Sequence, residues 1–475
     1  MDILQEARGL DSREKERMKS ITAELEAVWR MEEIKAKQRS RDRNIIEGDK
    51  NTSYFQAVAN QQNRKKKIIR LESLDGWIED NDKMLNHVVD FYKSLFGQEE
   101  SSGVKLDDDF WMEDEKVTSL ENDLLEADFF EEETKEAVFG SYADGPPGPD
   151  GLPFLFYQVF WDVIKKDLMM LVNSFGKGQL DLDRLNYGMI ILIPKEPEAK
   201  ILKKFRPISL LNCSFKIFAK MLNNRLVVVA DRLIASNQTA FIKGRYILES
   251  VVTAHEIIHE VHRSKEEGVM LKLDYEKAYD RVSWSFLEDM LKSRGFGERW
   301  ISWIRKVVRG GSLCIRMNDE NSSYFKPGKG LRQGDPLSPL LFNLVADVFS
   351  RMLMKAAKQN LITGLLPQVI DGGIISLQYA DDTLLFLENN LEKASTLKWL
   401  LVCFEQMSGM KINYDKSDLL TIGLEEDDAN CFAKIFCCKK SDFPIKYLGV
   451  PLHFTKLRKQ DLQPVIDKII KRIAG

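Results

Sequence analysis

The chain has 475 residues, which is long for one hydrophobic core, so two or three subdomains are expected. A hydrophobic content of 44% fits a folded globular protein, and a net charge of −4 excludes a uniformly basic nucleic-acid-binding chain. The six cysteines lack the paired CxxC spacing of a zinc ribbon or knuckle. The first residues lack the apolar core of a signal peptide, and no run approaches membrane-spanning length, so an intracellular protein is predicted.

The N-terminal part is expected to be a helical extension that spans residues 1–70. Residues 12–62 are rich in Glu, Lys, Arg, Ala and Met and contain no proline, which predicts one or two long helices. The extension ends in a basic patch that is either a solvated face or a nucleic-acid contact. The residues of this patch are Arg64, Lys65, Lys66 and Lys67.

Acidic residues dominate from residue 105 to residue 136, which predicts a solvated linker. This linker belongs to a segment of linker and helices over residues 71–144, with one helix expected at 130–139. The sequence GPPGPDG at 145–151 predicts a loop boundary, because glycine and proline disfavour both helix and central strand.

Beyond this loop, strand and helix patterns alternate irregularly. Short apolar runs predict strands at 187–194 and 269–274, and two strands within 374–387 that fold about Ala380 and Asp381. Helical spacing predicts helices over residues 214–230, 250–262, 284–292, 339–357 and 461–473. Because the order has no regular βαβ period, an α+β fold is favoured over a doubly wound sheet.

A second basic stretch, residues 292–309, interleaves Arg and Lys with Trp300 and Trp303. Basic residues with aromatic neighbours are typical of nucleic-acid-binding surfaces. The stretch is therefore either such a surface or an ordinary solvated face.

Two adjacent carboxylates, Asp381 and Asp382, interrupt the apolar run LQYADDTLLF at 377–386. Successive side chains of a strand point to opposite faces, so an uninterrupted strand would bury one unpaired charge at a high cost. The pair therefore sits at a hairpin turn, or a cation compensates its charge. Asp274 closes another predicted strand, so three carboxylates converge if the two elements are neighbours in one sheet. Alternatively, Asp274 caps the next turn and the pair marks a solvent-facing hairpin.

A cluster of three carboxylates repels itself unless divalent cations lie within it. Oxygen ligands without His or Cys favour Mg²⁺, with Mn²⁺ as the alternative. Two such ions roughly 3.5–4 Å apart clamp the attacking and leaving oxygens of a phosphoryl transfer. The three aspartates therefore predict a two-metal site for phosphoryl transfer.

Three motifs surround these carboxylates: LDYEKAYDRV at 273–282, GLRQGDPLSP at 330–339 and YADD at 379–382. In this order they closely resemble the palm motifs of reverse transcriptases, and more narrowly those of plant-like non-LTR (LINE-type) retrotransposons. Further stretches resemble other motifs of that group. They are GDKNTSYF at 48–55 in its N-terminal extension, GPDGLP at 148–153, IPK at 193–195, FRPISLL at 205–211 and QTAFIKGR at 238–245 in its fingers, and GMKIN at 409–413 with Lys416 and Ser417, then YLGVP at 447–451, in its later palm and primer grip.

The resemblance implies roles for the metal-binding residues. Asp274 and Asp381 would bind both metal ions and act in catalysis, with Asp382 as the third catalytic carboxylate. The carbonyl of Tyr275 would add a ligand. These residues would hold two Mg²⁺ ions, or Mn²⁺ in their place.

The resemblance also implies roles around the incoming dNTP. Arg206 and Lys195 would hold its triphosphate, for which guanidinium geometry is suited. Tyr279 would stack beneath the sugar and exclude a 2′-hydroxyl. Gln333 and Gly334 would lie against the nascent base pair.

Other residues would act on the leaving group and on the nucleic acid. Lys411 or Lys416 would protonate the leaving pyrophosphate as a general acid. The primer end would be positioned by Tyr447, Leu448 and Gly449. Arg245 would contact nucleic acid, like the basic patch at residue 64.

The implied architecture is a right-hand polymerase fold within the α+β class. Its parts would be helical fingers at 145–264, an antiparallel-sheet palm at 265–440, a primer grip at 441–455 and the start of a truncated thumb at 456–475. The implied activity is that of an RNA-directed DNA polymerase, which joins dNTPs to a DNA primer on an RNA template, in the nucleus. By the resemblance, the chain would lack an endonuclease, the rest of the thumb and an RNase H domain.

Two alternatives remain open. The chain would be a catalytically silent relic if it bound nucleic acid without polymerising. The sequence HEIIH at 255–259 matches the HExxH signature of zinc peptidases, with His262 as a conceivable third ligand. The same pattern also fits an amphipathic helix with its histidines at the edge of the core.

Overall fold

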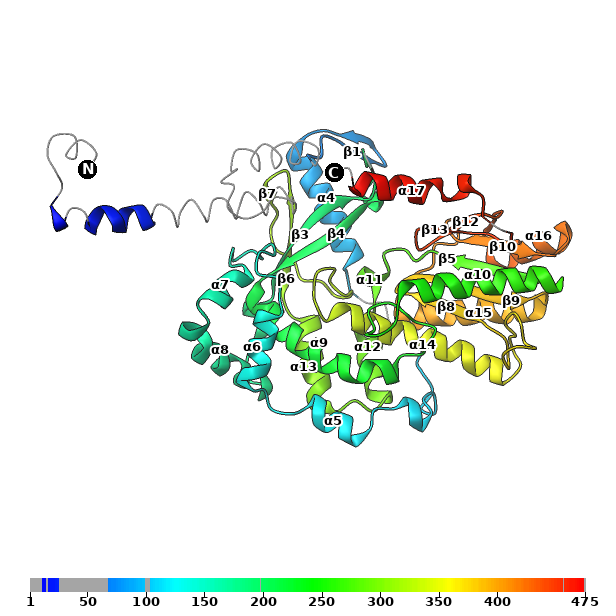
Figure 1. Ribbon diagram of the computed structural model, residues 1–475, viewed down its shortest axis with the longest axis horizontal. Helices are drawn as coiled ribbons and strands as arrows, with labels where there is room; N and C mark the ends of the chain where they lie inside the picture. The colour runs from blue at the N-terminus through cyan, green and yellow to red at the C-terminus, as the bar shows by residue number, and fades with distance from the viewer. Residues whose placement is uncertain are drawn as a thin grey trace.

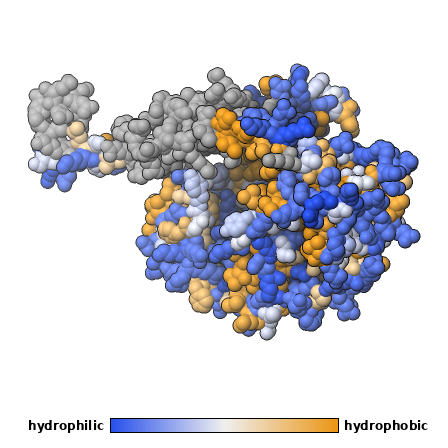
Figure 2. All heavy atoms as spheres, turned by 45° about the vertical axis from the view of Figure 1, so that its right-hand side comes forward, coloured by the Kyte–Doolittle hydropathy of each residue, from blue (hydrophilic) through white to orange (hydrophobic). Residues whose placement is uncertain are grey.

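The computed structural model describes residues 11–13, 16–24, 67–98, 103–196, 198–455 and 457–473 (Figure 1). Residues 16–24 are helical, and most of the predicted N-terminal extension, including its 48–55 motif, lies outside the described residues. Within the described ranges, none of the helices combines the length and apolarity needed to cross a membrane. Hydrophilic residues cover most of the face shown in Figure 2, with hydrophobic residues in scattered patches between them.

A five-stranded sheet, on the right of Figure 1, has the strand order β11-β10-β5-β9-β8. Its strands are β5 (Gly268–Leu273), β8 (Ser376–Tyr379), β9 (Asp382–Glu388), β10 (Asp418–Ile422) and β11 (Lys439–Lys440). β5 pairs antiparallel with both β9 and β10, and β8 and β9 form a hairpin. The strands predicted at 269–274 and within 374–387 are thereby confirmed.

Alternate side chains of this sheet enter two separate cores, as the two-residue period of a strand requires. Met270 and Leu384 join a core with the helix α10 (Ile247–Ser264), which runs across the sheet in Figure 1. Leu271 and Leu385 join the larger core with the helix α14 (Ser338–Lys358). Both faces are covered, which explains why most side chains of the central strands β5 and β9 are apolar.

A second sheet has the strand order β4-β3-β6-β7. Its strands are β3 (Tyr187–Pro194), β4 (Phe205–Leu211), β6 (Ser312–Met317) and β7 (Glu320–Asn321). The helix α4 (Asn81–Leu95) packs on this sheet through a separate core that includes Tyr92, Ile190 and Phe205. Two small hairpins complete the strands: β1 (Leu71–Ser73) with β2 (Gly76–Ile78), and β12 (Ile445–Tyr447) with β13 (Val450–Leu452).

Helices form most of the remaining body. They are α5 (Ser119–Leu125), α6 (Glu131–Phe139), α7 (Phe154–Val159), α8 (Trp161–Gly176), α9 (Cys213–Leu233), α11 (Ala278–Arg281), α12 (Trp284–Ser293), α13 (Glu298–Arg309), α15 (Leu391–Ser408), α16 (Glu426–Phe436) and α17 (Lys459–Ile473), with 3₁₀ turns at Glu113–Glu115, Leu182–Arg184 and Leu202–Lys204. All the helices predicted beyond residue 129 are confirmed, as are the strand at 187–194 and the loop at 145–151. Mixed helices and largely antiparallel sheets agree with the α+β prediction.

The acidic segment at 105–136 is not a solvated linker, and that prediction is wrong. Trp111 and Phe129 are buried in the largest core. Two of its carboxylates pair with arginines of α9: Glu133 lies 2.7 Å from Arg225, and Glu121 pairs with Arg232. Composition records the charge of a segment but not the partners that neutralise it.

In the basic stretch at 292–309 the aromatic side chains face inward, so they are not placed to stack on a nucleic acid. Trp300 and Trp303 are 0% and 1% exposed. The arginines around them pair with carboxylates of the same body, as Arg305 does with Glu288 at 2.9 Å. The stretch forms most of α13, and its tryptophans pack in the core.

Candidate active site

Strand register brings Asp274 to the turn that carries the aspartate pair. Leu273, the last residue of β5, pairs with Thr383 of β9, so Asp274 follows at the position across from Asp382. Tyr379 pairs with Asp382, which leaves Ala380 and Asp381 as a two-residue hairpin loop. Ala380 has a φ of 55°, the left-handed conformation that such tight turns require. All three aspartates are exposed. The hairpin explanation for the adjacent carboxylates is therefore confirmed.

The three carboxylates lie in one another's electric field. Partial burial raises the pKa of Asp381 and of Asp382, and the charges of Asp381 and Asp274 raise the pKa of Asp382 further. Burial also raises the pKa of Asp274, while Lys416 and Lys195 oppose that rise. A cation bound here would relieve this repulsion, and the donors are all oxygens, which fits Mg²⁺.

The three carboxylates are near one another, but their side chains do not converge on one metal-binding position. In the described part of the chain, no group of three or more His, Cys, Asp or Glu is arranged so that it could hold a metal ion. The predicted convergence of the three carboxylates is therefore confirmed only in part. Each carboxylate is anchored on a strand end or a turn, so a bound ion would have to draw the side chains together.

Residues 409–417 form hydrogen bonds with the backbone of Asp274 and its neighbours. The amide of Asn413 donates to the carbonyl of Asp274 at 2.7 Å, and the amide of Asp274 donates to Ser417 Oγ at 3.1 Å. Tyr275 forms an isolated bridge with Ile412. The lysines predicted as general acids flank this contact: Lys416 acts electrostatically on Asp274, and Lys411 acts on Glu276.

The predicted triphosphate-binding residues face the carboxylates from the second sheet. Lys195 directly follows β3, and Arg206 of β4 pairs with Ile193 across the sheet. The charges of Lys195 and Arg206 both lower the pKa of Asp381. Both side chains are exposed, so they are free to meet an anionic ligand.

Tyr279 and the loop around Gln333 lie on the side of the site nearest α14. The ring of Tyr279 stacks on Phe342 at a centroid distance of 4.3 Å and an interplanar angle of 10°. Gln333 accepts the amide of Ser209 at 2.8 Å. Gly334 has a φ of 115°, and a Cβ there would lie 2.5 Å from the Ser209 carbonyl. Gly334 therefore lets β4 approach this loop closely. The family resemblance predicts that Gly334 lies against the nascent base pair.

The sequence indicated no role for two charged residues beside Tyr279, Asp280 and Lys277. Asp280 is buried, which raises its pKa to about 7, and one of its oxygens accepts from Gln333 at 3.3 Å. Lys277 lies over the rings of Phe91 and Tyr92 of α4, at 5.6 and 5.4 Å. The sequence signal for Asp280 was its place as the second aspartate of the motif at 273–282, six residues after Asp274. These contacts join α4 to the site.

The predicted primer-grip residues form the hairpin β12–β13 beside Asp382. Leu448 and Gly449, with φ values of 48° and 92°, make its two-residue turn. Burial raises the pKa of the Tyr447 hydroxyl, and the charge of Asp382 raises it further, so the two groups are near one another. Lys272 of β5 donates to the carbonyl of Lys446 at 2.9 Å, which ties the hairpin to the five-stranded sheet.

Two groups of residues were predicted to contact nucleic acid: Arg245, and the basic patch at residues 64–67. The Arg245 guanidinium donates to Asp231 and to the carbonyls of Ile234, Ala235 and Gln238. These bonds brace the segment that follows α9, and the nucleic-acid contact of Arg245 stays a prediction. Arg64, Lys65 and Lys66 lie outside the described residues, and Lys67 is exposed.

The HExxH helix uses its histidines for packing. Burial lowers the pKa of His255, which hydrogen-bonds to the backbone of Pro451. The ring of His262 lies 4.4 Å from that of Phe454. His255, His259 and His262 are all described, and they belong to no group arranged for metal binding among the described residues. The zinc-peptidase alternative therefore lacks its ligand set.

Comparison with known proteins identifies the class to which this site belongs. Residues 193–452 match the family model described as "Reverse transcriptase (RNA-dependent DNA polymerase)", so the chain belongs to the reverse transcriptase family. Its relatives place it with the enzymes of non-LTR retrotransposons. It is 29% identical, over 90% of its length, to "Transposon TX1 uncharacterized 149 kDa protein" of Xenopus laevis, of which it covers 32%.

Two further relatives come from R2 elements. One is the "Retrovirus-related Pol polyprotein from type-2 retrotransposable element R2DM" of Drosophila melanogaster, with 27% identity over 68% of this chain and 31% of the relative. The other is the "Retrovirus-related Pol polyprotein from type-1 retrotransposable element R2" of Nasonia vitripennis, with 31% identity over 51% of this chain and 22% of the relative. The chain thus spans about a third or less of the length of these relatives.

Proposed function

We propose that this chain catalyses RNA-templated DNA synthesis, adding dNTPs to the 3′-hydroxyl of a DNA primer. The observation that carries the proposal is the meeting of Asp274 with the Asp381–Asp382 turn, opposite the cationic Lys195 and Arg206. Three anionic groups facing two cationic groups suit a metal-bound triphosphate, because the carboxylates attract the metal and the cations attract the phosphates.

The fold divides in a way that suits a right-hand polymerase. We assign the fingers to residues 145–264, the palm to 265–440, the primer grip to 441–455 and the start of the thumb to 456–475. Residues 71–144 pack against these parts as a structured support. The N-terminal extension at 1–70 would precede them and carry the basic patch at residue 64.

In this proposal, different side chains carry out different steps of nucleotidyl transfer. Asp274, Asp381 and Asp382, with the carbonyl of Tyr275, would hold two Mg²⁺ ions, which when bound activate the primer hydroxyl and offset the charge of the leaving pyrophosphate. Lys195 and Arg206 orient the triphosphate, and Lys416 or Lys411 delivers a proton to the pyrophosphate. Tyr447, Leu448 and Gly449 hold the primer end. Positioning and charge stabilisation supply most of the rate.

The partners follow from the same site. Template sequence is read by base pairing, so the protein contacts mainly shape and backbone. Gln333, whose side chain donates to Asp280 at 3.3 Å, would lie against the nascent base pair. Nuclear residence follows if the primer is nicked chromosomal DNA, as the resemblance implies.

The proposal is tested by dNTP incorporation on an RNA template annealed to a DNA primer. We expect extension with Mg²⁺ and none after chelation with EDTA, because the carboxylates alone cannot neutralise the reacting phosphate. Restoring Mg²⁺ should restore extension. Template–primer binding without extension under every metal condition would contradict the proposal and indicate a silent relic.

Tyr279→Ala is expected to raise ribonucleotide incorporation relative to deoxyribonucleotide incorporation by at least about tenfold. The ring lies flat on Phe342 at the edge of the site, so its removal opens space for a 2′-hydroxyl. The measurement is the ratio of kcat/KM for rNTP and dNTP. Tyr279→Phe keeps the ring and should leave the ratio unchanged. An equal ratio in the alanine variant would remove Tyr279 from sugar selection.

A further inference from the structure

One short segment, residues 235–240, lies against the turn that carries Asp381; we call it the 235–240 strap. It follows α9 and runs beside β8, the edge strand of the five-stranded sheet. The amide of Gln378 donates to Asn237 O at 2.8 Å, and the amide of Thr239 donates to Gln378 O at 3.0 Å. The strap therefore extends the sheet by one bridge and covers the exposed edge of β8.

The side chain of Gln238 holds both backbone groups of Ala380. Its Oε1 accepts the Ala380 amide at 2.9 Å and the Ala240 amide at 3.1 Å, and its Nε2 donates to the Ala380 carbonyl at 3.3 Å. Gln238 is 0% exposed, so water does not compete for these bonds. Because Ala380 sits in the left-handed region directly before Asp381, its orientation sets where that carboxylate points.

The strap is in turn held by a buried polar stripe on α14. Asn343 donates to the Ala240 carbonyl at 2.6 Å, Asp347 accepts the Ala235 amide at 2.8 Å, and Ser350 accepts from Asn237 at 3.1 Å. Spacings of four and three residues place these side chains on one helix face. Buried polar groups are costly unless hydrogen-bonded, and here each of the three side chains makes one hydrogen bond to the strap.

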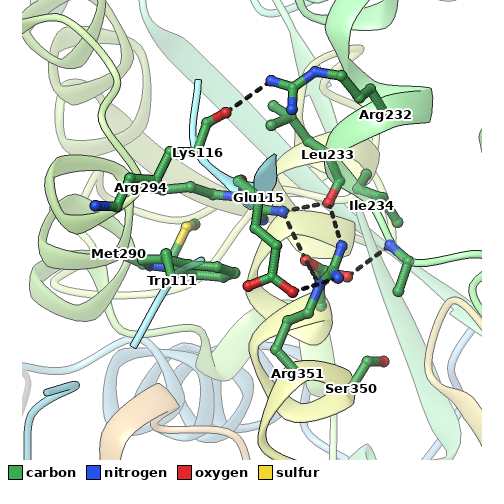
Figure 3. Close-up of polar contacts among 12 residues, drawn as sticks. Trp111, Glu115, Lys116, Arg232, Leu233, Ile234, Met290, Arg294, Ser350 and Arg351 are labelled. Carbon is green, nitrogen blue, oxygen red and sulfur yellow. Dashed lines mark hydrogen bonds and ion pairs between the residues drawn. The ribbon is translucent and has the colours of Figure 1, made fainter. Parts of the chain in front are cut away.

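A buried ionic cluster fixes the strap where α9 ends (Figure 3). Arg294 contacts Asp347 at 2.9 Å and donates to the Leu233 carbonyl. Arg351 contacts Glu115 at 2.6 Å and donates to the same carbonyl at 3.1 Å. In Figure 3 these side chains converge on the backbone of Leu233 and Ile234. The strap therefore starts from a rigid point.

We infer that Gln238 is a positioning residue for Asp381, and that the 235–240 strap transmits the rigidity of α14 to the catalytic turn. The inference rests on the proposed function, because it assigns Gln238 to the geometry of that reaction. A catalytic group displaced by about 1 Å costs on the order of 10²-fold in rate. Without Gln238, the two-residue turn would depend on the β-ladder pairing of Tyr379 with Asp382.

The test compares two substitutions with a matched control. Gln238→Met keeps the length but removes all three bonds, and Gln238→Glu keeps the two that the oxygen accepts. Gln158→Met is the control, because it makes the same exchange in α7, where the Gln158 side chain donates to the carbonyls of Val138 and Ser141 at 3.0 Å. Each variant is checked for cooperative unfolding, then assayed for primer extension and for Mn²⁺ binding by electron paramagnetic resonance.

We expect Gln238→Met to lower kcat by about 10- to 100-fold, with the KM for dNTP and the Kd for template–primer within about twofold of wild type. Gln238→Glu should lose less, and Gln158→Met should keep wild-type kcat. Mn²⁺ binding should weaken in Gln238→Met and not in the control. If Gln238→Met does not fold, Gln238→Glu becomes the test of the inference. The expected result is then a lower kcat at an unchanged KM for dNTP.

The inference is overturned if a folded Gln238 variant keeps kcat within about twofold of wild type, or if Gln158→Met loses as much as Gln238→Met. Failure of the proposed function gives a different pattern. The wild-type protein would then fail to extend a primer at all, while the Mn²⁺ comparison would still report whether Gln238 sets the turn.

Discussion

Asp381→Asn is expected to lower the rate of primer extension at least about 10³-fold, equivalent to about 4 kcal/mol of transition-state stabilisation. Asparagine keeps the size of the side chain but removes the anionic oxygen that a divalent cation needs. The charges of Lys195 and Arg206 already act on this carboxylate, so its loss also disturbs the cations that face it. The measurement is single-nucleotide extension at saturating dNTP.

The same substitution should leave the metal-free protein as stable as the wild type, or more stable. Burial raises the pKa of Asp381, and its charge raises the pKa of Asp382, so the ionised carboxylates destabilise the metal-free fold. Removing one charge relieves that strain, which is a common cost of active sites. Thermal unfolding in EDTA measures this effect and separates lost chemistry from lost folding.

Asp371→Asn is the control, because Asp371 is an exposed aspartate in the loop before β8. It should keep wild-type extension and stability. Normal extension by Asp381→Asn would contradict the assignment of the active site. Lost extension together with lost template–primer binding would instead point to a damaged nucleic-acid surface.

Asp347→Ala is expected to lower the free energy of unfolding by about 3–5 kcal/mol. Asp347 is 0% exposed and contacts Arg294 at 2.9 Å and Arg351 at 3.4 Å. Its removal leaves the fully buried Arg294 without its carboxylate partner, and burial already lowers the pKa of Arg294. The amide of Ala235 would also lose its acceptor. Chemical denaturation measures the change.

Glu260→Gln provides the comparison for this second prediction. Glu260 and Arg263 form an ion pair at 2.7 Å on the surface of α10, where water screens the charges. Its loss should leave the denaturation midpoint almost unchanged. If Asp347→Ala behaves like Glu260→Gln, the buried cluster of Figure 3 does not hold the structure together, and the rigid point from which the strap starts is lost as an explanation.

Local pattern was enough to predict most elements around the candidate site. The strand before Asp274, the turn at Ala380 and Asp381, and the buried helix at 339–357 all carry their signal within a few neighbouring residues. Apolar spacing and turn chemistry act over that short range. The roles predicted for Lys195, Arg206, Tyr279 and the primer-grip residues stay predictions, although the fold brings all of them to the carboxylates.

The errors have a common physical cause. The acidic residues at 105–136 and the tryptophans at 292–309 were judged by composition alone. In the structure Glu133 pairs with Arg225, 92 residues along the chain, and Trp300 and Trp303 are buried in the core. A charge is solvated or buried according to what packs against it, and sequence spacing does not record that. Gln238 was matched to a motif without a role, because its partner Ala380 is 142 residues away.

The sequence by itself determined which acids are available, that they stand at strand ends and a turn, and to which family the ordered motifs point. Only the tertiary structure decided that β5 and β9 are neighbours in register, so that Asp274 lies across from Asp382. It also decided that the polar side chains of α14 face the 235–240 strap. The reason is that register and helix facing depend on long-range packing, in which the energy of each contact depends on residues distant along the chain.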